Sequence, residues 1–259
     1  MNSLNRCPLM RLALSSLLAR GSCWLLLAAG LLFSWFSPWL TPWDENPRLL
    51  QPARVQACWI YLWAAAATWL PYQSARIGSQ FSKSGIIEHL SISGMRVPRM
   101  LFEMASAVLI WTTSALILLT LLMAYSCSPS RMAEAELWLT SLIQQVLLYA
   151  LVTAPLSVIP ASLATRFSHI TASLMTTALF LMGFTAHIWL YPITGQDNWG
   201  FLSSLWLAIP HYHLADLTDR LVFKMGPLEA SVFVKVMVTL FLQGMTLIAA
   251  SLWLFRKRH

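Results

Sequence analysis

The sequence predicts an all-α polytopic membrane protein with six transmembrane helices, an N-terminal amphipathic helix, and a short cytoplasmic helix between the second and third spans. Of its 259 residues, 58% are hydrophobic and only 10% are charged, whereas a soluble domain usually carries about a quarter charged residues. Its apolar segments approach the roughly 20 residues that a helix needs to cross a hydrocarbon core of about 30 Å. These observations exclude an ordinary soluble enzyme, and 13 Trp, 12 Phe and 6 Tyr exclude a disordered chain.

The first 22 residues are expected to form a helix along the inner leaflet of the membrane. Its apolar residues fall on one side and its polar residues toward another: Leu9, Leu12, Ala13 and Leu17 against Arg11, Ser15 and Arg20. Because Pro8 interrupts the first turn, a floppy basic tail stays an alternative. The next apolar segment ends in bulky Trp and Phe residues without an A-x-A-like cleavage site, which favours an uncleaved first span over a signal peptide.

Six spans are expected to form one transmembrane domain over residues 1–259, with a polar outer segment at Thr194–Ser231. The spans are Ser22–Leu40, Val55–Leu70, Leu101–Tyr125, Trp138–Pro160, Ile170–Ile193 and Val232–Phe255. The second span is the shortest. In the fourth, Gln144 and Gln145 are expected to form hydrogen bonds between helices. Glu103 lies near the end of the third, where its charge can reach the membrane surface.

Basic residues set the expected orientation, because cytoplasmic loops are enriched in Lys and Arg. With the N-terminus inside, 11 of them are inner: Arg6, Arg11, Arg20, Arg76, Lys83, Arg96, Arg99, Arg166, Arg256, Lys257 and Arg258. Five are outer: Arg48, Arg54, Arg131, Arg220 and Lys224. Both termini are therefore expected in the cytoplasm, and the net charge of +7 indicates orientation rather than a nucleic-acid partner. Outer tryptophans are expected in an aromatic belt: Trp35, Trp39, Trp43, Trp59, Trp138, Trp189, Trp199 and Trp206.

The stretch from Gln73 to Met100 is the most informative cytoplasmic part. Its apolar residues are Ile86, Ile87, Leu90 and Ile92, and charged residues lie on both sides of them. Their spacing predicts one or two helical turns with an apolar stripe, which can insert into a groove on a soluble partner.

A resemblance to a known family appears at residues 84–96, which read SGIIEHLSISGMR. Together with the order of spans, this stretch resembles the ABC type-2 transporter permease family. In that family the segment is the coupling helix that engages a separate ATPase, so the resemblance implies this role for Gly85, Ile86, Glu88, Leu90 and Arg96. Residues 209–219, IPHYHLADLTD, are similar to the outer segment of permeases in the multicopper-enzyme maturation subgroup. The family often has a Gly-Lys pair where this chain has Phe102 and Glu103.

No nucleotide-binding or hydrolase motif is present, so we expect that the chain is not an enzyme. The nearest match to a Walker loop runs from Gly78 to Gly85, but Ser82 and Ile77 occupy the places where that loop needs glycine. We expect no directly bound cofactor, with ATP used by the partner subunit. Cys7, Cys23, Cys58 and Cys127 lack the spacing of a zinc site or a disulfide framework.

An outer cluster of His211, His213 and Asp216 is a weaker candidate for a metal site. The favoured alternative is a short amphipathic helix over Leu214–Phe223 that lies on the membrane.

The resemblance implies the permease subunit of an ATP-binding cassette exporter in the plasma (bacterial inner) membrane. It implies a homodimer, or a heterodimer with a similar permease, bound to ABC ATPase subunits and surrounded by lipid. A membrane assembly or structural protein without transport is the alternative, with a metal-binding enzyme that uses His211 and His213 as a remote one. The sequence does not specify the substrate.

Overall fold

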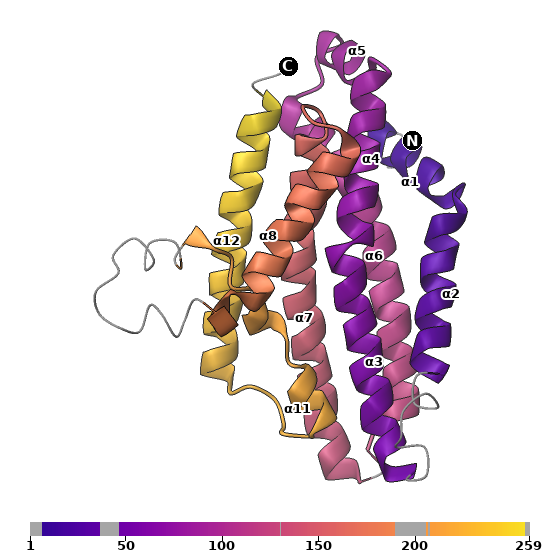
Figure 1. Ribbon diagram of the computed structural model, residues 1–259, viewed down its shortest axis with the longest axis vertical. Helices are drawn as coiled ribbons and strands as arrows, with labels where there is room; N and C mark the ends of the chain where they lie inside the picture. Colours follow the sequence, from indigo (N-terminus) through magenta and orange to yellow (C-terminus); the bar gives the residue numbers. More distant parts are fainter. Residues whose placement is uncertain (1–6, 37–46, 130, 190–205, 207, 257–259) are drawn as a thin grey trace.

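Long helices run lengthwise through the molecule in the computed structural model (Figure 1). The structure describes residues 7–36, 47–129, 131–189, 206 and 208–256, and no strand occurs among them. The all-α prediction is therefore confirmed for this part of the chain.

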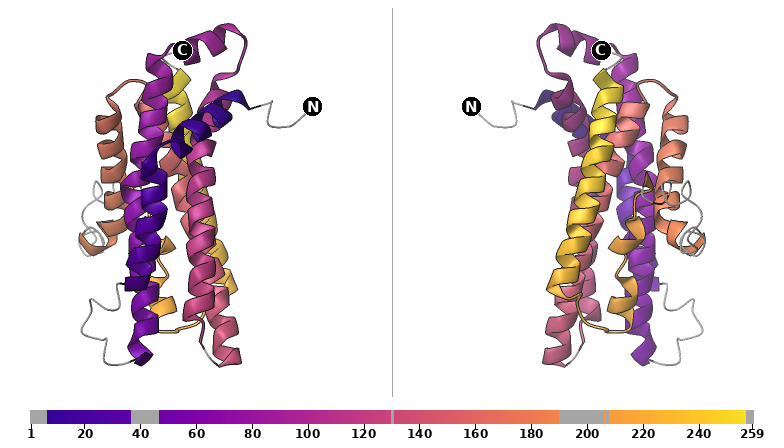
Figure 2. Two further views of the ribbon diagram at one scale, coloured as in Figure 1. Left: turned by 90° about the vertical axis from the view of Figure 1, so that its right-hand side faces the viewer. Right: turned by 90° about the vertical axis from the view of Figure 1, so that its left-hand side faces the viewer.

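The helices follow one another up and down the bundle. They are α1 (Pro8–Leu18), α2 (Gly21–Phe36), α3 (Pro47–Ala67), α4 (Trp69–Lys83), α5 (Ile86–Ile92), α6 (Val97–Cys127), α7 (Met132–Leu163), α8 (His169–Trp189), the 3-10 helix η3 (Tyr212–Ala215), α11 (Thr218–Val222) and α12 (Ala230–Arg256). One end, here named the α5 end, carries α1, α5 and the last turns of α12 (Figures 1 and 2). The opposite end, here named the α11 end, carries α11 and the first turns of α12.

Four helices are long and apolar enough to cross a membrane: α6, α7, α8 and α12. A fifth crossing results if α1 and α2 count as one span, although the chain bends by 63° between them. The described residues thus contain four or five such candidates rather than six. The predicted second span, residues 55–70, covers the second half of α3 and the first turn of α4 and is not among them. Residues 37–40 and 190–193 of two other predicted spans lie outside the described residues.

α7 lies at the centre of the bundle, where it packs against α4, α6, α8 and α12. Its Tyr149 is buried, and the centroid of the Tyr149 ring lies 4.9 Å from that of Trp63. The Tyr149 hydroxyl donates a hydrogen bond to Leu62 O at 2.9 Å. Trp59 and Trp138 are also buried, so their predicted place in a lipid-facing belt was wrong. Trp138 Nε1 instead donates to Leu221 O at 3.0 Å. These tryptophans therefore hold helices together.

The contact of α4 with α7 depends on glycine. A Cβ atom at Gly78 would lie 2.3 Å from Ala161 O, a distance that real Cβ contacts do not reach. The two helix backbones therefore touch directly, as they do where small residues line helix interfaces in membranes. The polar side chains of Gln73, Ser74 and Ser79 on α4 are buried as well.

Candidate functional site

Two glycines in the left-handed conformation fix the ends of α5. Gly85 has a φ of +70° and Gly94 a φ of +88°, values that side chains with a Cβ atom rarely adopt. After α5, Gly94 N donates to Ser91 O at 3.1 Å and Met95 N donates to Leu90 O at 3.0 Å, which is the Schellman pattern of helix termination. The predicted cytoplasmic helix is thus a separate seven-residue element beyond the end of α4 (Figure 1).

The apolar stripe of α5 faces the protein itself. Ile87 is fully buried in the main hydrophobic core, and the partly buried Ile86 and Leu90 pack against that core. Only Ile92 points outward, with an exposed fraction of 86%. The prediction that the stripe is presented to a partner is therefore contradicted for Ile87, which the bundle covers fully, whereas Ile86 and Leu90 are only partly covered.

The outward face of α5 is polar apart from Ile92. Glu88 and His89 are exposed on the helix, and Arg96 is exposed directly after it. Of the five residues that the resemblance singled out, Gly85 shapes the backbone and Ile86 and Leu90 attach the helix. Glu88 and Arg96 are left on the surface. Together with Ile92 they form what we name the α5 face.

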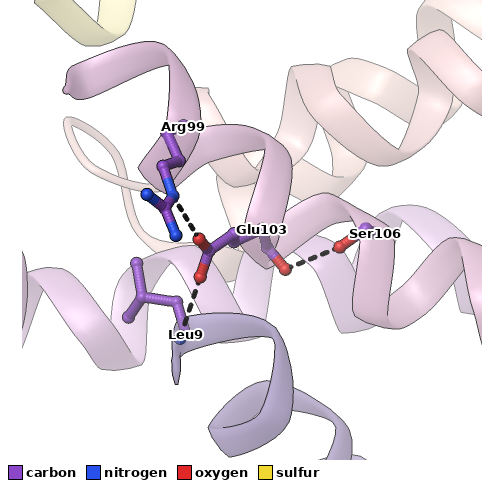
Figure 3. Close-up of polar contacts among 4 residues, drawn as sticks. All are labelled: Leu9, Arg99, Glu103 and Ser106. Atoms are coloured by element: carbon purple, nitrogen blue, oxygen red, sulfur yellow. Dashed lines mark hydrogen bonds and ion pairs between the residues drawn. The ribbon is translucent and has the colours of Figure 1, made fainter. Parts of the chain in front are cut away.

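Glu103 anchors α1 beside this corner, as Figure 3 shows. The carboxylate is buried and accepts hydrogen bonds from Leu9 N at 3.1 Å and from Arg99 Nε at 2.8 Å. Pro8 occupies the first turn of α1, where its missing N–H costs nothing. The N–H of Leu9 would otherwise lack a partner, and a negative charge is favourable at a helix N-terminus. Glu103 therefore caps α1 with defined partners instead of reaching for the membrane surface.

The alternative that the N-terminal segment is a floppy basic tail is contradicted from residue 8 onward. α1 buries Leu9, Ala13 and Leu17 at helical spacing, whereas Arg11 and Leu12 stay exposed. A helix is therefore confirmed over residues 8–18, whereas Leu12, which was expected on its apolar side, is exposed.

Residues 208–229, here named the return segment, begin against α8 at η3 and then run along the bundle to α11, which packs against α3 and α7 (Figure 1). A Cβ atom at Gly183 of α8 would lie 2.6 Å from Pro210 O and 2.8 Å from Tyr212 Cδ2. The segment therefore packs on bare helix backbone. It contains η3 and α11, so the single helix predicted over Leu214–Phe223 is split. At the split, Asp216 Oδ1 accepts a hydrogen bond from Thr218 N at 3.1 Å.

Three glutamines attach the return segment to the bundle. Gln243 Oε1 of α12 accepts a hydrogen bond from His211 N at 3.0 Å, and Gln145 Oε1 of α7 accepts one from Leu217 N. Gln144 holds both backbone groups of Leu228, accepting from its N–H at 2.8 Å and donating to its carbonyl at 3.0 Å. Gln144 and Gln145 were expected to join two helices. The structure shows that they instead satisfy backbone groups of the return segment that lie outside its two short helices.

The candidate metal residues do not converge. The rings of His211 and His213 are 5.7 Å apart and nearly perpendicular, and Asp216 Oδ1 accepts a hydrogen bond from Trp63 Nε1 at 3.3 Å. Among the residues that the structure describes, no group of three or more His, Cys, Asp or Glu side chains could hold a metal ion.

His213 makes the stability of the return segment depend on pH. Burial first, and then the neighbouring His187, lower the pKa of His213 from 6.5 to about 4; burial also lowers the pKa of His211. Between about pH 6.5 and about pH 4 the unfolded chain takes up protons that the folded chain does not, so the free energy of unfolding falls as pH falls.

We therefore expect a lower melting temperature in detergent at about pH 5 than at about pH 8, and a smaller difference in His213→Asn. His89→Asn, a change at an exposed histidine of α5, is the control and is expected to keep the wild-type dependence. Equal pH dependence in wild type and His213→Asn would contradict this assignment.

In the described part of the chain, the residues singled out from the sequence thus fall at two places: the α5 face, with Glu103 anchoring α1 beside it, and the return segment. The sequence predicted α5 and its residues but not the bond from Glu103 to α1. The only signal for that bond was the presence of Glu103, an acidic residue, inside an apolar span. No protein-family model, curated protein or solved structure matches the chain.

Proposed function

We propose that the chain is the membrane-spanning permease subunit of an ATP-binding cassette exporter, coupled through α5 to a separate ATPase. The observation that carries the proposal is the construction of α5. It is a short helix beyond the bundle end, bounded by two left-handed glycines and attached through Ile87, with Glu88, Ile92 and Arg96 exposed. This arrangement suits a helix that receives force from a soluble partner and passes it to α4 and α6.

Six crossings are part of the proposal. α2, α6, α7, α8 and α12 each cross once, and α3 with α4 crosses as one element. What supports the last of these is that α3 and α4 follow one another along the bundle, interrupted only at Thr68 (Figure 1). The N- and C-terminal helices then end on the side of α5, which we place in the cytoplasm of a bacterial inner membrane because most Lys and Arg residues fall there.

The substrate path is proposed to form between two subunits, either two copies of this chain or this chain and a similar permease. ATP binding would move the ATPase subunits together and displace α5. Such coupling requires an element with two positions that both sites influence.

The test is co-purification of an ATPase with the full-length chain from membranes of its own host. Glu88→Arg and Ile92→Asp are each expected to lower the recovered ATPase activity, about tenfold if one well-placed contact is lost. Glu136→Arg is the matched control, since it makes the same charge change at an exposed acid in the first turns of α7, far along the chain from α5. It should leave recovery unchanged.

Unchanged recovery in both α5 variants would refute the coupling role. Failure of the wild-type chain to recover any Walker-motif protein would instead favour the assembly or structural alternative. Equal melting temperatures of variants and wild type would show that the bundle is intact.

A further inference from the structure

A polar junction joins the start of α2 to α4 near the α5 end. Arg20 Nη2 donates to Gln80 Oε1 at 2.9 Å, and Gln73 Nε2 donates to Ser22 Oγ at 3.2 Å. Residues three or four apart share a helix face. Arg76 follows Gln73 by three residues and precedes Gln80 by four, so it lies on the face of α4 that contacts Arg20 and Ser22.

Two guanidinium groups therefore lie near one another at this junction without an acidic partner. Neither Arg20 nor Arg76 forms an ion pair with a residue that the structure describes. The pKa of Arg20 is lowered, first by burial and then by repulsion from Arg76. Arg20 nevertheless stays charged, so the junction holds uncompensated positive charge.

Buried polar atoms at the same junction also lack partners. Arg20 Nη1 and Gln73 Oε1 are buried and form no hydrogen bond with the described residues. Gln73 is only 1% exposed. Because an unsatisfied buried polar group is costly, these two atoms beside two arginines indicate a site that a polar ligand completes. The arginines define its charge as negative, and the acceptor Gln73 Oε1 requires a hydroxyl or another donor on the same ligand.

Exposed apolar side chains lie further along α2. They include Leu25, Leu32 and Phe33, with exposed fractions of 71%, 57% and 44%. Leu25 follows Arg20 by five residues, so this apolar surface begins about 8 Å along the helix from the arginine. A charged group beside an apolar helix surface matches the layout of a phospholipid.

We propose that Arg20 and Arg76 bind the phosphate of an anionic phospholipid, with its acyl chains along the exposed apolar surface of α2. Arginine suits this ligand because its planar guanidinium can donate two parallel hydrogen bonds to phosphate oxygens. The position of the pair at the start of α2 is the level at which headgroups lie if α2 crosses the bilayer. Free phosphate has the same oxygen chemistry and is separated from lipid by the test.

Native mass spectrometry of the purified full-length chain measures the binding. Phosphatidylglycerol and phosphatidylcholine with the same acyl chains are added separately, and the lipid-bound fraction is compared. We expect selective retention of phosphatidylglycerol, and about tenfold weaker retention in Arg76→Gln, since a hydrogen-bonded charge is worth on the order of 1.5 kcal/mol or more. Arg11→Gln, at an exposed arginine of α1, is the matched control and should bind as wild type.

A second variant keeps the test independent of folding. Arg76→Lys preserves the charge and should bind more phosphatidylglycerol than Arg76→Gln at equal melting temperature. Equal loss in Arg11→Gln and Arg76→Gln, or no preference for phosphatidylglycerol in the wild type, would overturn the site. Displacement of long-chain phosphatidylglycerol by inorganic phosphate as readily as by short-chain phosphatidylglycerol would overturn the lipid as its source.

Discussion

Gly78→Ala is expected to lower the free energy of unfolding by roughly 3 kcal/mol, the upper range for overpacking a close contact. The new methyl group would lie 2.3 Å from Ala161 O. The neighbour is backbone of α7, so no side chain can rotate away to make room. Relief requires that α4 and α7 separate, which loosens the central contact of the bundle and exposes buried groups such as Ser74.

Gly244→Ala is the matched control for this substitution. Its Cβ would meet Pro155 Cγ at 3.6 Å, an ordinary van der Waals distance. Alanine has a helix propensity about 1 kcal/mol better than glycine, so Gly244→Ala should be neutral or stabilising while Gly78→Ala destabilises. Melting of the purified variants in one detergent compares them. A melting temperature for Gly78→Ala at or above that of Gly244→Ala would contradict the direct backbone contact.

Glu103→Leu is expected to release α1 from α6. The variant loses the acceptor of Leu9 N, and loss of an N-cap acceptor costs up to about 2 kcal/mol. Because α1 is short, this cost is large relative to what holds it. Limited trypsin digestion should then cleave at Arg11 faster than in the wild type, since a detached helix exposes its backbone.

Arg99→Gln distinguishes the contribution of the helix cap, the bond from Leu9 N to Glu103, from that of the ion pair between Arg99 and Glu103. Arg99 has a side chain that is 52% exposed, and its replacement leaves the bond from Leu9 N to Glu103 in place. We expect near wild-type digestion at Arg11 for Arg99→Gln. If Arg99→Gln and Glu103→Leu were cleaved alike, the ion pair rather than the cap would hold α1.

The parts of the fold that hydropathy determines could be predicted. α6, α7, α8 and α12 are long apolar runs, and α5 follows from its spacing and its glycines. α3 and α4 were harder, because α4 buries Gln73 and Ser74 against its neighbours and therefore lacks the apolar composition by which spans are recognised. The predicted second span joined the end of one helix to the start of the next.

The candidate site was predictable as a segment but not in its contacts. The spacing of Ile86, Ile87 and Leu90 predicts an apolar stripe whether a partner or the chain itself covers it. Only the packing of Ile87 in the core distinguishes the two. Likewise Glu103 and Gln145 stand out as polar residues in apolar helices, but their acceptor roles depend on Leu9 and Leu217, which are distant in sequence and contribute only backbone N–H groups.

The length of α6 has a consequence for the membrane around it. Its 31 residues measure about 46 Å at 1.5 Å per residue, well beyond a hydrocarbon core of about 30 Å. The average tilt of about 20° shortens this only slightly, so several turns extend past the hydrocarbon. Arg99 and Glu103 occupy the first turns of α6 at the α5 end, and the turns that follow them are apolar. A thinner or thicker bilayer can therefore be accommodated if the hydrocarbon boundary lies at a different apolar turn of α6. Little hydrophobic mismatch should result, and the depth of α5 should follow the thickness of the bilayer.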